Sequence, residues 1–282
     1  MASTEGPALA PKAPSSELKT RVLSAIVMIA LALAAAYWGG WPFALFWLAA
    51  GIAIMVEWAD MTGAEPRRIV QTVFGLGLVA LTLLYLSGGS FVIGAVTGLV
   101  FLALGALITK GSREKLWAAS GFAYAVVIVL VPPMVRDYPE IGILGLIWMF
   151  AVVWTTDIAA YFTGRTLGGP KLCPAISPKK TWSGFFGGLI AATLAGCLVV
   201  WLGGSFGVTH SFSLGSTIAL SMVASVASQI GDLAESALKR HCDVKDSSHL
   251  IPGHGGVMDR LDGFWAVSLI IGIILFVTHG AS

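Results

Sequence analysis

The chain has 282 residues, of which 56% are hydrophobic and only 11% charged, and its formal net charge is +2. Because a soluble domain carries about 25% charged residues, this composition excludes a soluble globular protein and favours one embedded in a membrane. Cys173, Cys197 and Cys242 have no paired spacing, so they predict neither a disulfide framework nor a zinc site.

Apolar segments follow one another along the chain after a polar N-terminal stretch. Residues 1–16, rich in Pro, Ala and Ser, are predicted to form a disordered tail. Most of the segments approach the ~20 residues that a helix needs to cross the hydrocarbon core of a bilayer. They cover residues 22–38, 41–59, 69–87, 90–109, 117–135, 141–163, 184–204, 214–233 and 263–279. We therefore expect an all-α polytopic membrane protein with about nine transmembrane helices, the first five within residues 17–140 and the last four within 141–282.

The basic residues predict how the chain is oriented. If the segments alternate across the membrane, sixteen of the seventeen Lys and Arg residues fall on the side of the N-terminus and only Arg136 falls on the other side. Lys and Arg concentrate in the cytoplasmic loops of membrane proteins. We therefore expect a cytoplasmic N-terminus, two cytoplasmic catalytic loops at residues 164–183 and 234–262, and a multi-pass location in the cell (inner) membrane.

Acidic residues lie within or beside several apolar segments. Glu57 and Asp60 are interpreted as markers of a helix end at the depth of the lipid headgroups. Asp157 lies inside the sixth segment, and Asp232 and Glu235 lie at the end of the eighth. Because ionisable groups at membrane depth usually face a wet cavity or a partner, the later acids are candidates for a functional site.

The end of the eighth segment and the start of the ninth combine several kinds of polar group. If the eighth helix continues, Asp232, Ser236 and Lys239 share one face, which suits a metal and an anion. Asp259 and Asp262 lie one turn apart, and a divalent cation would relieve their repulsion. Carboxylate oxygens of this kind favour Mg²⁺ shared with substrate phosphates. For the eighth helix, the alternative is an ordinary surface ion pair between Glu235 and Lys239, which lie four residues apart.

The segment between these helices includes "SHLIPGHGGVMDRLDG", residues 248–263. Gly255 and Gly256 have no Cβ, so their backbone amides can approach a phosphate closely. A zinc site made by His241, Cys242 and His249 is a weaker alternative, because their spacing fits no common pattern.

Residues 236–262 resemble the signature of the phosphatidate cytidylyltransferases, also called CDP-diacylglycerol synthases. The matching positions are Ser236, Lys239, Arg240, Lys245, Asp246, Ser248, Pro252, His254, Gly255, Gly256, Asp259, Arg260 and Asp262. Residues 157–188, which contain "DIAAYFTGR" and "SPKKTW", are similar to a second characteristic region of that family. One position departs from it, because family members commonly have Glu where this chain has Ser183. Whatever that carboxylate does is expected to be absent or replaced here.

The resemblance implies that CTP and phosphatidic acid react to give CDP-diacylglycerol and pyrophosphate. The expected metal is Mg²⁺, bound as one or two ions, and an additional monovalent cation is left open. Asp232 and Asp259 are the first candidates for its ligands. Asp246, Asp262 and Asp157 are the second-rank candidates. The phosphates are expected to meet Ser236, Lys239, Arg240, Lys245 and Arg260. The other loop is expected to form a nucleotide-facing wall with Ser177, Lys179, Lys180 and Thr181. His254, Gly255 and Gly256 are expected to line the phosphates, with His254 also a candidate proton carrier for the leaving pyrophosphate. Asp232, Asp259, Lys239, Arg260 and His254 are the residues predicted to be catalytic.

Other classes of membrane protein remain open at this stage. A transporter also uses acids within helices, but here the polar residues cluster at one membrane face and no internal repeat is evident. A CDP-alcohol phosphotransferase would need a longer pattern of which "DRLDG" is only a fragment. A CTP-dependent polyprenol or lipid kinase is closer in chemistry. The expected partners are CTP, phosphatidic acid and the bilayer, without nucleic acid, and a homodimer is left open.

Overall fold

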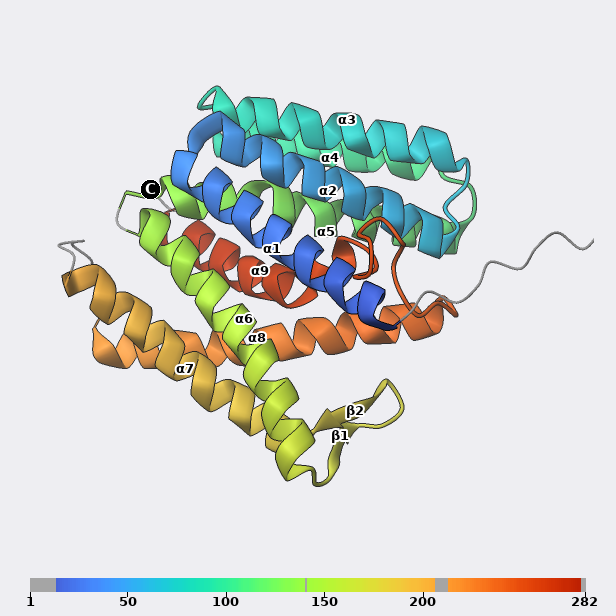
Figure 1. Cartoon of the computed structure of the whole chain (residues 1–282). Helices are drawn as coiled ribbons and strands as arrows, with labels where there is room; N and C mark the ends of the chain where they lie inside the picture. Colours follow the sequence, from blue (N-terminus) through green and yellow to red (C-terminus); the bar gives the residue numbers. More distant parts are fainter. Residues whose placement is uncertain (1–13, 140, 206–212, 280–282) are drawn as a thin grey trace, which may run out of the picture.

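The computed structural model describes residues 14–139, 141–205 and 213–279, with side chains from residue 22 onward (Figure 1). Of the predicted tail, residues 1–13 lie outside the described residues. The helices within the described part are α1 Pro14–Trp38, α2 Gly40–Thr62, α3 Arg67–Leu86, α4 Phe91–Ile108, α5 Ser112–Asp137, α6 Gly142–Leu167, α7 Trp182–Ser205, α8 Leu214–His241 and α9 Met258–His279.

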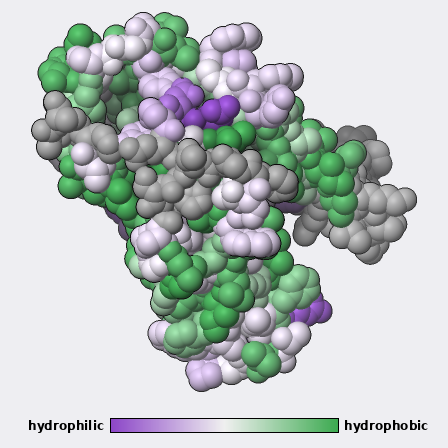
Figure 2. All heavy atoms as spheres, turned by 90° about the vertical axis from the view of Figure 1, so that its left-hand side faces the viewer, coloured by the Kyte–Doolittle hydropathy of each residue, from purple (hydrophilic) through white to green (hydrophobic). Residues whose placement is uncertain are grey.

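Eight of the described helices, α2 to α9, are long and apolar enough to cross a membrane. The described apolar part of α1, Val22–Trp38, is shorter and coincides with the first predicted segment. The all-α polytopic fold predicted from the sequence is therefore confirmed, and the protein is a multi-pass membrane protein. Figure 2, which views the molecule from the left of Figure 1, shows a surface on which strongly hydrophilic residues form only small patches.

The two long loops predicted from the sequence are shorter than expected. The helix α8 continues to His241 and α9 starts at Met258, so the connection between them is residues 242–257. Within the 164–183 loop, strands β1 (Lys171–Cys173) and β2 (Ser177–Thr181) pair antiparallel, with Lys171 opposite Thr181 and Cys173 opposite Ser177. Gly168 and Gly169 adopt φ of 62° and 98°, which ends α6 and lets the chain turn into this hairpin.

The helix α9 lies in the middle of the bundle in Figure 1 and packs against α2, α5, α6 and α8. The ring of Phe264 stacks on Trp47 of α2 with centroids 5.1 Å apart. The next residue, Trp265, stacks on Tyr124 of α5 at 4.3 Å, and its indole N–H donates to the Tyr124 carbonyl oxygen over 3.1 Å. These aromatic contacts fix the start of α9, which carries Asp259 and Asp262.

Two glycines let α8 and α9 approach each other closely. A Cβ on Gly231 would lie 2.6 Å from the Asp262 carbonyl oxygen and 2.8 Å from the Ala266 Cβ. On the facing helix, a Cβ on Gly263 would collide with the Ser228 hydroxyl. Small residues of this kind allow membrane helices to pack backbone to backbone. The acids at the end of α8 are thereby brought next to those at the start of α9.

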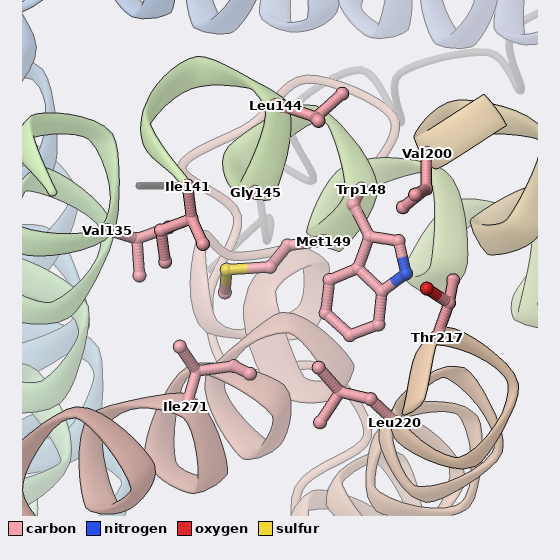
Figure 3. A pocket seen from close by; sticks show the side chains of 10 residues that line it. All are labelled: Val135, Ile141, Leu144, Gly145, Trp148, Met149, Val200, Thr217, Leu220 and Ile271. Carbon is pink, nitrogen blue, oxygen red and sulfur yellow. The ribbon is translucent and has the colours of Figure 1, made fainter. Parts of the chain in front are cut away.

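Buried hydroxyl groups join α8 to α6 further along the bundle. The Trp148 indole N–H donates to the Ser221 hydroxyl over 3.0 Å, and the Thr156 hydroxyl donates to the Ser225 hydroxyl over 2.9 Å. Beyond this seam, toward the end of the bundle that carries Arg136, lies a cavity lined almost wholly by hydrocarbon side chains, with Trp148, Leu220 and Ile271 among them (Figure 3).

Candidate active site

The β1–β2 hairpin and the α8–α9 connection lie toward the same end of the bundle, to the right in Figure 1. The two are joined by an ion pair, because the Lys180 Nζ at the end of β2 lies 2.5 Å from the Asp232 Oδ2 on α8. The Ser236 hydroxyl, one turn further along α8, donates to the other Asp232 oxygen over 3.4 Å. The structure thus brings together the two regions of sequence that were predicted to share a site.

A second ion pair links the end of α8 to the start of α9. The Lys239 Nζ lies 2.6 Å from the Asp259 Oδ1 and 3.5 Å from the Glu235 Oε1. The side chains of Glu235 and Asp259 are only 2% and 3% exposed. The Lys239 ammonium therefore lies between two buried carboxyl groups, one from α8 and one from α9.

The other oxygen of Asp259 organises the α8–α9 connection. The Asp259 Oδ2 accepts hydrogen bonds from the Ser247 N–H at 2.9 Å, the Ser247 hydroxyl at 3.0 Å and the Gly256 N–H at 2.8 Å. The Gly256 N–H was expected to face a phosphate, but in this structure it donates its hydrogen bond to Asp259. Gly255 has φ of 87°, and a Cβ there would lie 2.7 Å from the Asp259 Oδ2, so a glycine is required for this turn.

Glu57 of α2 is a site residue that sequence reasoning missed. Its exposed fraction is 2%, so the interpretation as a headgroup-level helix end is wrong for this residue. Its Oε1 accepts from the Ser248 hydroxyl at 2.7 Å and the Val257 N–H at 2.8 Å. Its Oε2 accepts from the Met258 N–H at 2.8 Å and the Ser247 hydroxyl at 3.1 Å. The helical period was the available signal, since Glu57 follows Ile54 by one turn on the face of α2 that is buried.

Asp60, the other acid of α2, does lie at the surface. It is exposed, accepts a hydrogen bond from the Gln71 side chain over 3.0 Å and lies 3.6 Å from the Arg67 guanidinium. The same sequence interpretation thus fits one of two neighbouring acids and fails for the other.

Further carboxylates gather beside these ion pairs. The Glu235 and Asp262 carboxyl groups lie close enough to interact electrostatically. Asp157 of α6 interacts electrostatically with Asp262, Asp232 and the basic residues Lys180 and Arg260. Among the described residues, no three His, Cys, Asp or Glu side chains converge as a ready-made metal site.

Several other predicted site residues lie in or beside the α8–α9 connection. His254 is half-buried, and its Nδ1 lies 2.8 Å from the Ser24 hydroxyl of α1, so α1 reaches this loop. Asp246 is exposed and lies beside Gly255, where a Cβ would be 3.5 Å from the Asp246 Cβ and 2.7 Å from the Asp259 Oδ2. Among the predicted site residues, the basic ones that are exposed are Lys179, Arg240, Lys245 and Arg260. His241, from the zinc alternative, hydrogen-bonds Arg113 and lies 5.6 Å from the Trp117 ring.

Two predicted residues of the hairpin, and Ser183 just after it, make contacts within the protein. Thr181 is buried, and its hydroxyl accepts from the Gly184 N–H over 3.1 Å at the start of α7. Ser177 is half-buried and pairs with Cys173 in the strand ladder. The Ser183 hydroxyl donates to the Gly168 carbonyl oxygen and lies 3.0 Å from the Thr181 hydroxyl.

A sequence profile described as "Cytidylyltransferase family" matches residues 19–278. The chain belongs to the cytidylyltransferase family. It is 40% identical over 264 residues to "Phosphatidate cytidylyltransferase" of Brucella suis biovar 1, covering 91% of this chain and 92% of that protein. It is also similar to proteins of that name from Haemophilus influenzae, at 35% identity over 88% of this chain and 95% of the relative, and from Staphylococcus epidermidis, at 30% over 93% and 100%.

In this cytidylyltransferase the family's two characteristic regions meet at one end of the bundle. The hairpin contributes Lys180, α8 contributes Asp232 and Lys239, and α9 contributes Asp259. The profile also covers α2, and Glu57 shows that this helix takes part in the architecture of the same site.

Proposed function

We propose that this cytidylyltransferase is a phosphatidate cytidylyltransferase, which converts CTP and phosphatidate to CDP-diacylglycerol and pyrophosphate. A phosphate oxygen of phosphatidate attacks the α-phosphorus of CTP, a new P–O bond forms, and the bond from that phosphorus to the β-phosphate oxygen breaks. The nucleophile is a phosphate monoester that is largely ionised at neutral pH, so no strong general base is needed. The single observation that carries the proposal is the full-length match to relatives of that name.

The charge distribution at the site supports this reaction. One anion must attack another, so the barrier is lowered by groups that neutralise charge and hold an in-line geometry. Lys180 and Lys239 lie in ion pairs with carboxylates, and Arg260 lies exposed on the first turn of α9. We propose that these cations, with Arg240 at the end of α8 and Lys245 from the α8–α9 connection, take the triphosphate and the lipid phosphate. His254 and Gly255 are proposed to line the phosphates.

The carboxylates are proposed to hold Mg²⁺. The donor set fits, because hard carboxylate oxygens are the ligands that Mg²⁺ prefers and it usually takes only one or two from a protein. Asp232 and Asp259, through its Oδ1, would hold the ion, with Asp157 and Asp262 beside them, and each of the first pair now faces a lysine ammonium. The ion would neutralise charge on the phosphates of CTP.

We also propose that this end of the bundle faces the cytoplasm, where CTP is found. Arg136, the one basic residue expected on the opposite side, donates to the Ala36 carbonyl oxygen over 2.7 Å at the other end of α1. The basic residues named above for the site lie at the opposite end, which is consistent with the tendency of Lys and Arg to remain on the cytoplasmic side.

The test uses the full chain purified in detergent with phosphatidic acid, radiolabelled CTP and Mg²⁺. We expect label in the lipid phase and release of pyrophosphate only when both substrates are present. For cytidylyl transfer the label is in the cytidine or the α-phosphate of CTP. Labelling of a polyprenol from CTP labelled in its γ-phosphate, without labelling of phosphatidic acid from α-labelled CTP, would identify a kinase instead. No CTP turnover with either lipid would refute the proposal.

A further inference from the structure

We propose that Glu57 is a positioning residue for the CTP-binding loop, acting from a helix that lies far away in sequence. The loop is the α8–α9 connection, which Glu57 contacts at two places. Ser247 and Ser248 lie in its first half, and Val257 and Met258 lie at its junction with α9. The assignment of this loop to CTP rests on the proposed function.

The N-terminus of α9 explains why a carboxylate is needed here. The first N–H groups of a helix have no partner within the helix and carry partial positive charge. Glu57 accepts from the Val257 and Met258 N–H groups at 2.8 Å each, and its side chain is buried. An ionised carboxylate only accepts hydrogen bonds, so its two oxygens can accept from both N–H groups and from the two serine hydroxyls.

Ser247 connects Glu57 to Asp259. The Ser247 hydroxyl lies 3.1 Å from the Glu57 Oε2 and 3.0 Å from the Asp259 Oδ2. The Asp259 Oδ2 also accepts from the Ser247 and Gly256 N–H groups, so the loop is held from α2 and from α9 at once. The segment enclosed by these bonds contains His254 and Gly255. If the Glu57 carboxylate is removed, that segment is expected to move relative to the ammonium groups of Lys180 and Lys239.

The decisive variant is Glu57→Gln, which keeps the shape of the side chain. Each Glu57 oxygen accepts from one serine hydroxyl and one backbone N–H, and the glutamine NH₂ must replace one of these oxygens. The serine hydroxyl at that position can rotate and accept from the NH₂, but the backbone N–H loses its acceptor. We expect the KM for CTP to rise about tenfold or more, while the KM for phosphatidate changes little. The matched control is Asp60→Asn, a change of an exposed acid on the same helix that should leave both KM values unchanged.

Amide hydrogen exchange tests the same role without using activity. In Glu57→Gln the peptide containing Val257 and Met258 should exchange about tenfold faster or more, while the interior of α9 keeps its protection. If Glu57→Gln does not fold, Ser248→Ala, which removes one hydrogen bond to Glu57, is expected to give the same changes in smaller degree.

The outcomes separate this inference from the proposed function. An unchanged KM for CTP with unchanged exchange would overturn the role of Glu57. Equal rises in both KM values, or loss of protection throughout α9, would show a general structural role and overturn it as well. If the wild-type protein did not use CTP, the proposed function would fail and the link to CTP with it, whereas faster exchange confined to the junction would still show that Glu57 positions the loop.

Discussion

The Lys180 Nζ lies 2.5 Å from the Asp232 Oδ2, so the β1–β2 hairpin is tied to the polar end of α8. The side chains as a whole are partly exposed, at 25% and 35%, although the Lys180 Nζ atom itself is buried against Asp232. The pair joins the two sequence regions on which the proposed function rests. In the proposed function, Lys180 would leave Asp232 to bind a phosphate and Asp232 would leave Lys180 to bind a metal ion.

Removing either partner of this pair should impair turnover, and the two losses should not add. We expect Lys180→Met and Asp232→Asn each to lower kcat/KM by about 100-fold or more, because each leaves its partner's charge uncompensated and removes a group proposed to meet substrate or metal. The double variant should be little worse than the poorer single variant. The measurement is lipid labelling from CTP. Lys171→Met, which removes an exposed lysine from the same hairpin, serves as the control, and wild-type turnover in Lys180→Met would remove that residue from the site.

Asp259→Asn should abolish activity while leaving the bundle inserted and folded. The asparagine NH₂ must face either Lys239 or the backbone donors of Ser247 and Gly256, so one set of hydrogen bonds is lost. We expect turnover to fall by about 100-fold or more. Asp243→Asn is the matched control, because Asp243 is exposed in the same connection and its φ of 55° suits asparagine. Activity near that of the wild type in Asp259→Asn would show that the carboxylate charge is not required.

Ser183→Glu should reduce turnover rather than increase it. The Ser183 hydroxyl donates to the Gly168 carbonyl oxygen, and an ionised glutamate has no proton to donate there. We expect a several-fold loss, larger than that of Ser183→Ala, which removes the donor without adding a charge. Comparison of the two variants by lipid labelling decides the matter. A clear gain in Ser183→Glu would mean that the natural site lacks a carboxylate that the chemistry can use.

Gly231→Ala should disturb the site by separating α8 from α9. The added Cβ would lie 2.6 Å from the Asp262 carbonyl oxygen, which is backbone and cannot rotate away. Overpacking of this kind costs about 1–3 kcal/mol, so we expect a lower Tm in detergent together with reduced turnover. Gly98→Ala on α4 is the control, because a Cβ there meets no atom within 4 Å. An unchanged Tm in Gly231→Ala would show that the two helices are not packed this closely.

Removal of divalent metal should stop the reaction if the carboxylates hold Mg²⁺. We expect EDTA to abolish lipid labelling and added Mg²⁺ to restore it. Asp262→Asn, which keeps the primary ligands Asp232 and Asp259, should retain some activity but need about tenfold more Mg²⁺ for half-maximal rate. Full activity in EDTA would exclude the proposed metal site.

The transmembrane segments could be predicted from hydropathy alone, whereas the polar extensions of the helices depend on helix propensity, which hydropathy does not measure. The apolar run of α8 ends near residue 233, whereas the helix continues to His241 because Leu, Ala, Glu and Lys are good helix formers. The hairpin at residues 171–181 has only a weak signal, since strands of three and five residues carry little periodicity. The resemblance to a family indicated which residues gather near the site, and it did not indicate which partner each one has.

Glu57 shows most clearly what a single sequence does not contain. Its place on the core face of α2 follows from the helical period, but a buried carboxylate is disfavoured unless donors surround it. Those donors are the Ser247, Ser248, Val257 and Met258 groups, which lie near the other end of the chain. Only the tertiary arrangement brings them to α2. For Asp60 the local interpretation was sufficient, because its partners Arg67 and Gln71 are close in sequence.

The hydrogen bonds of Glu57 also bear on how the protein is assembled during synthesis. The helix α2 is synthesised and enters the bilayer long before α9. During that time the Glu57 carboxylate lacks the N–H groups that surround it in the folded protein. Burial of such a carboxylate is costly until its hydrogen-bond donors arrive. Insertion of α9 therefore supplies the missing hydrogen-bond donors to Glu57 and completes the α8–α9 connection. Chains that stop before α9 should remain poorly packed around α2, which would make them substrates for membrane proteases.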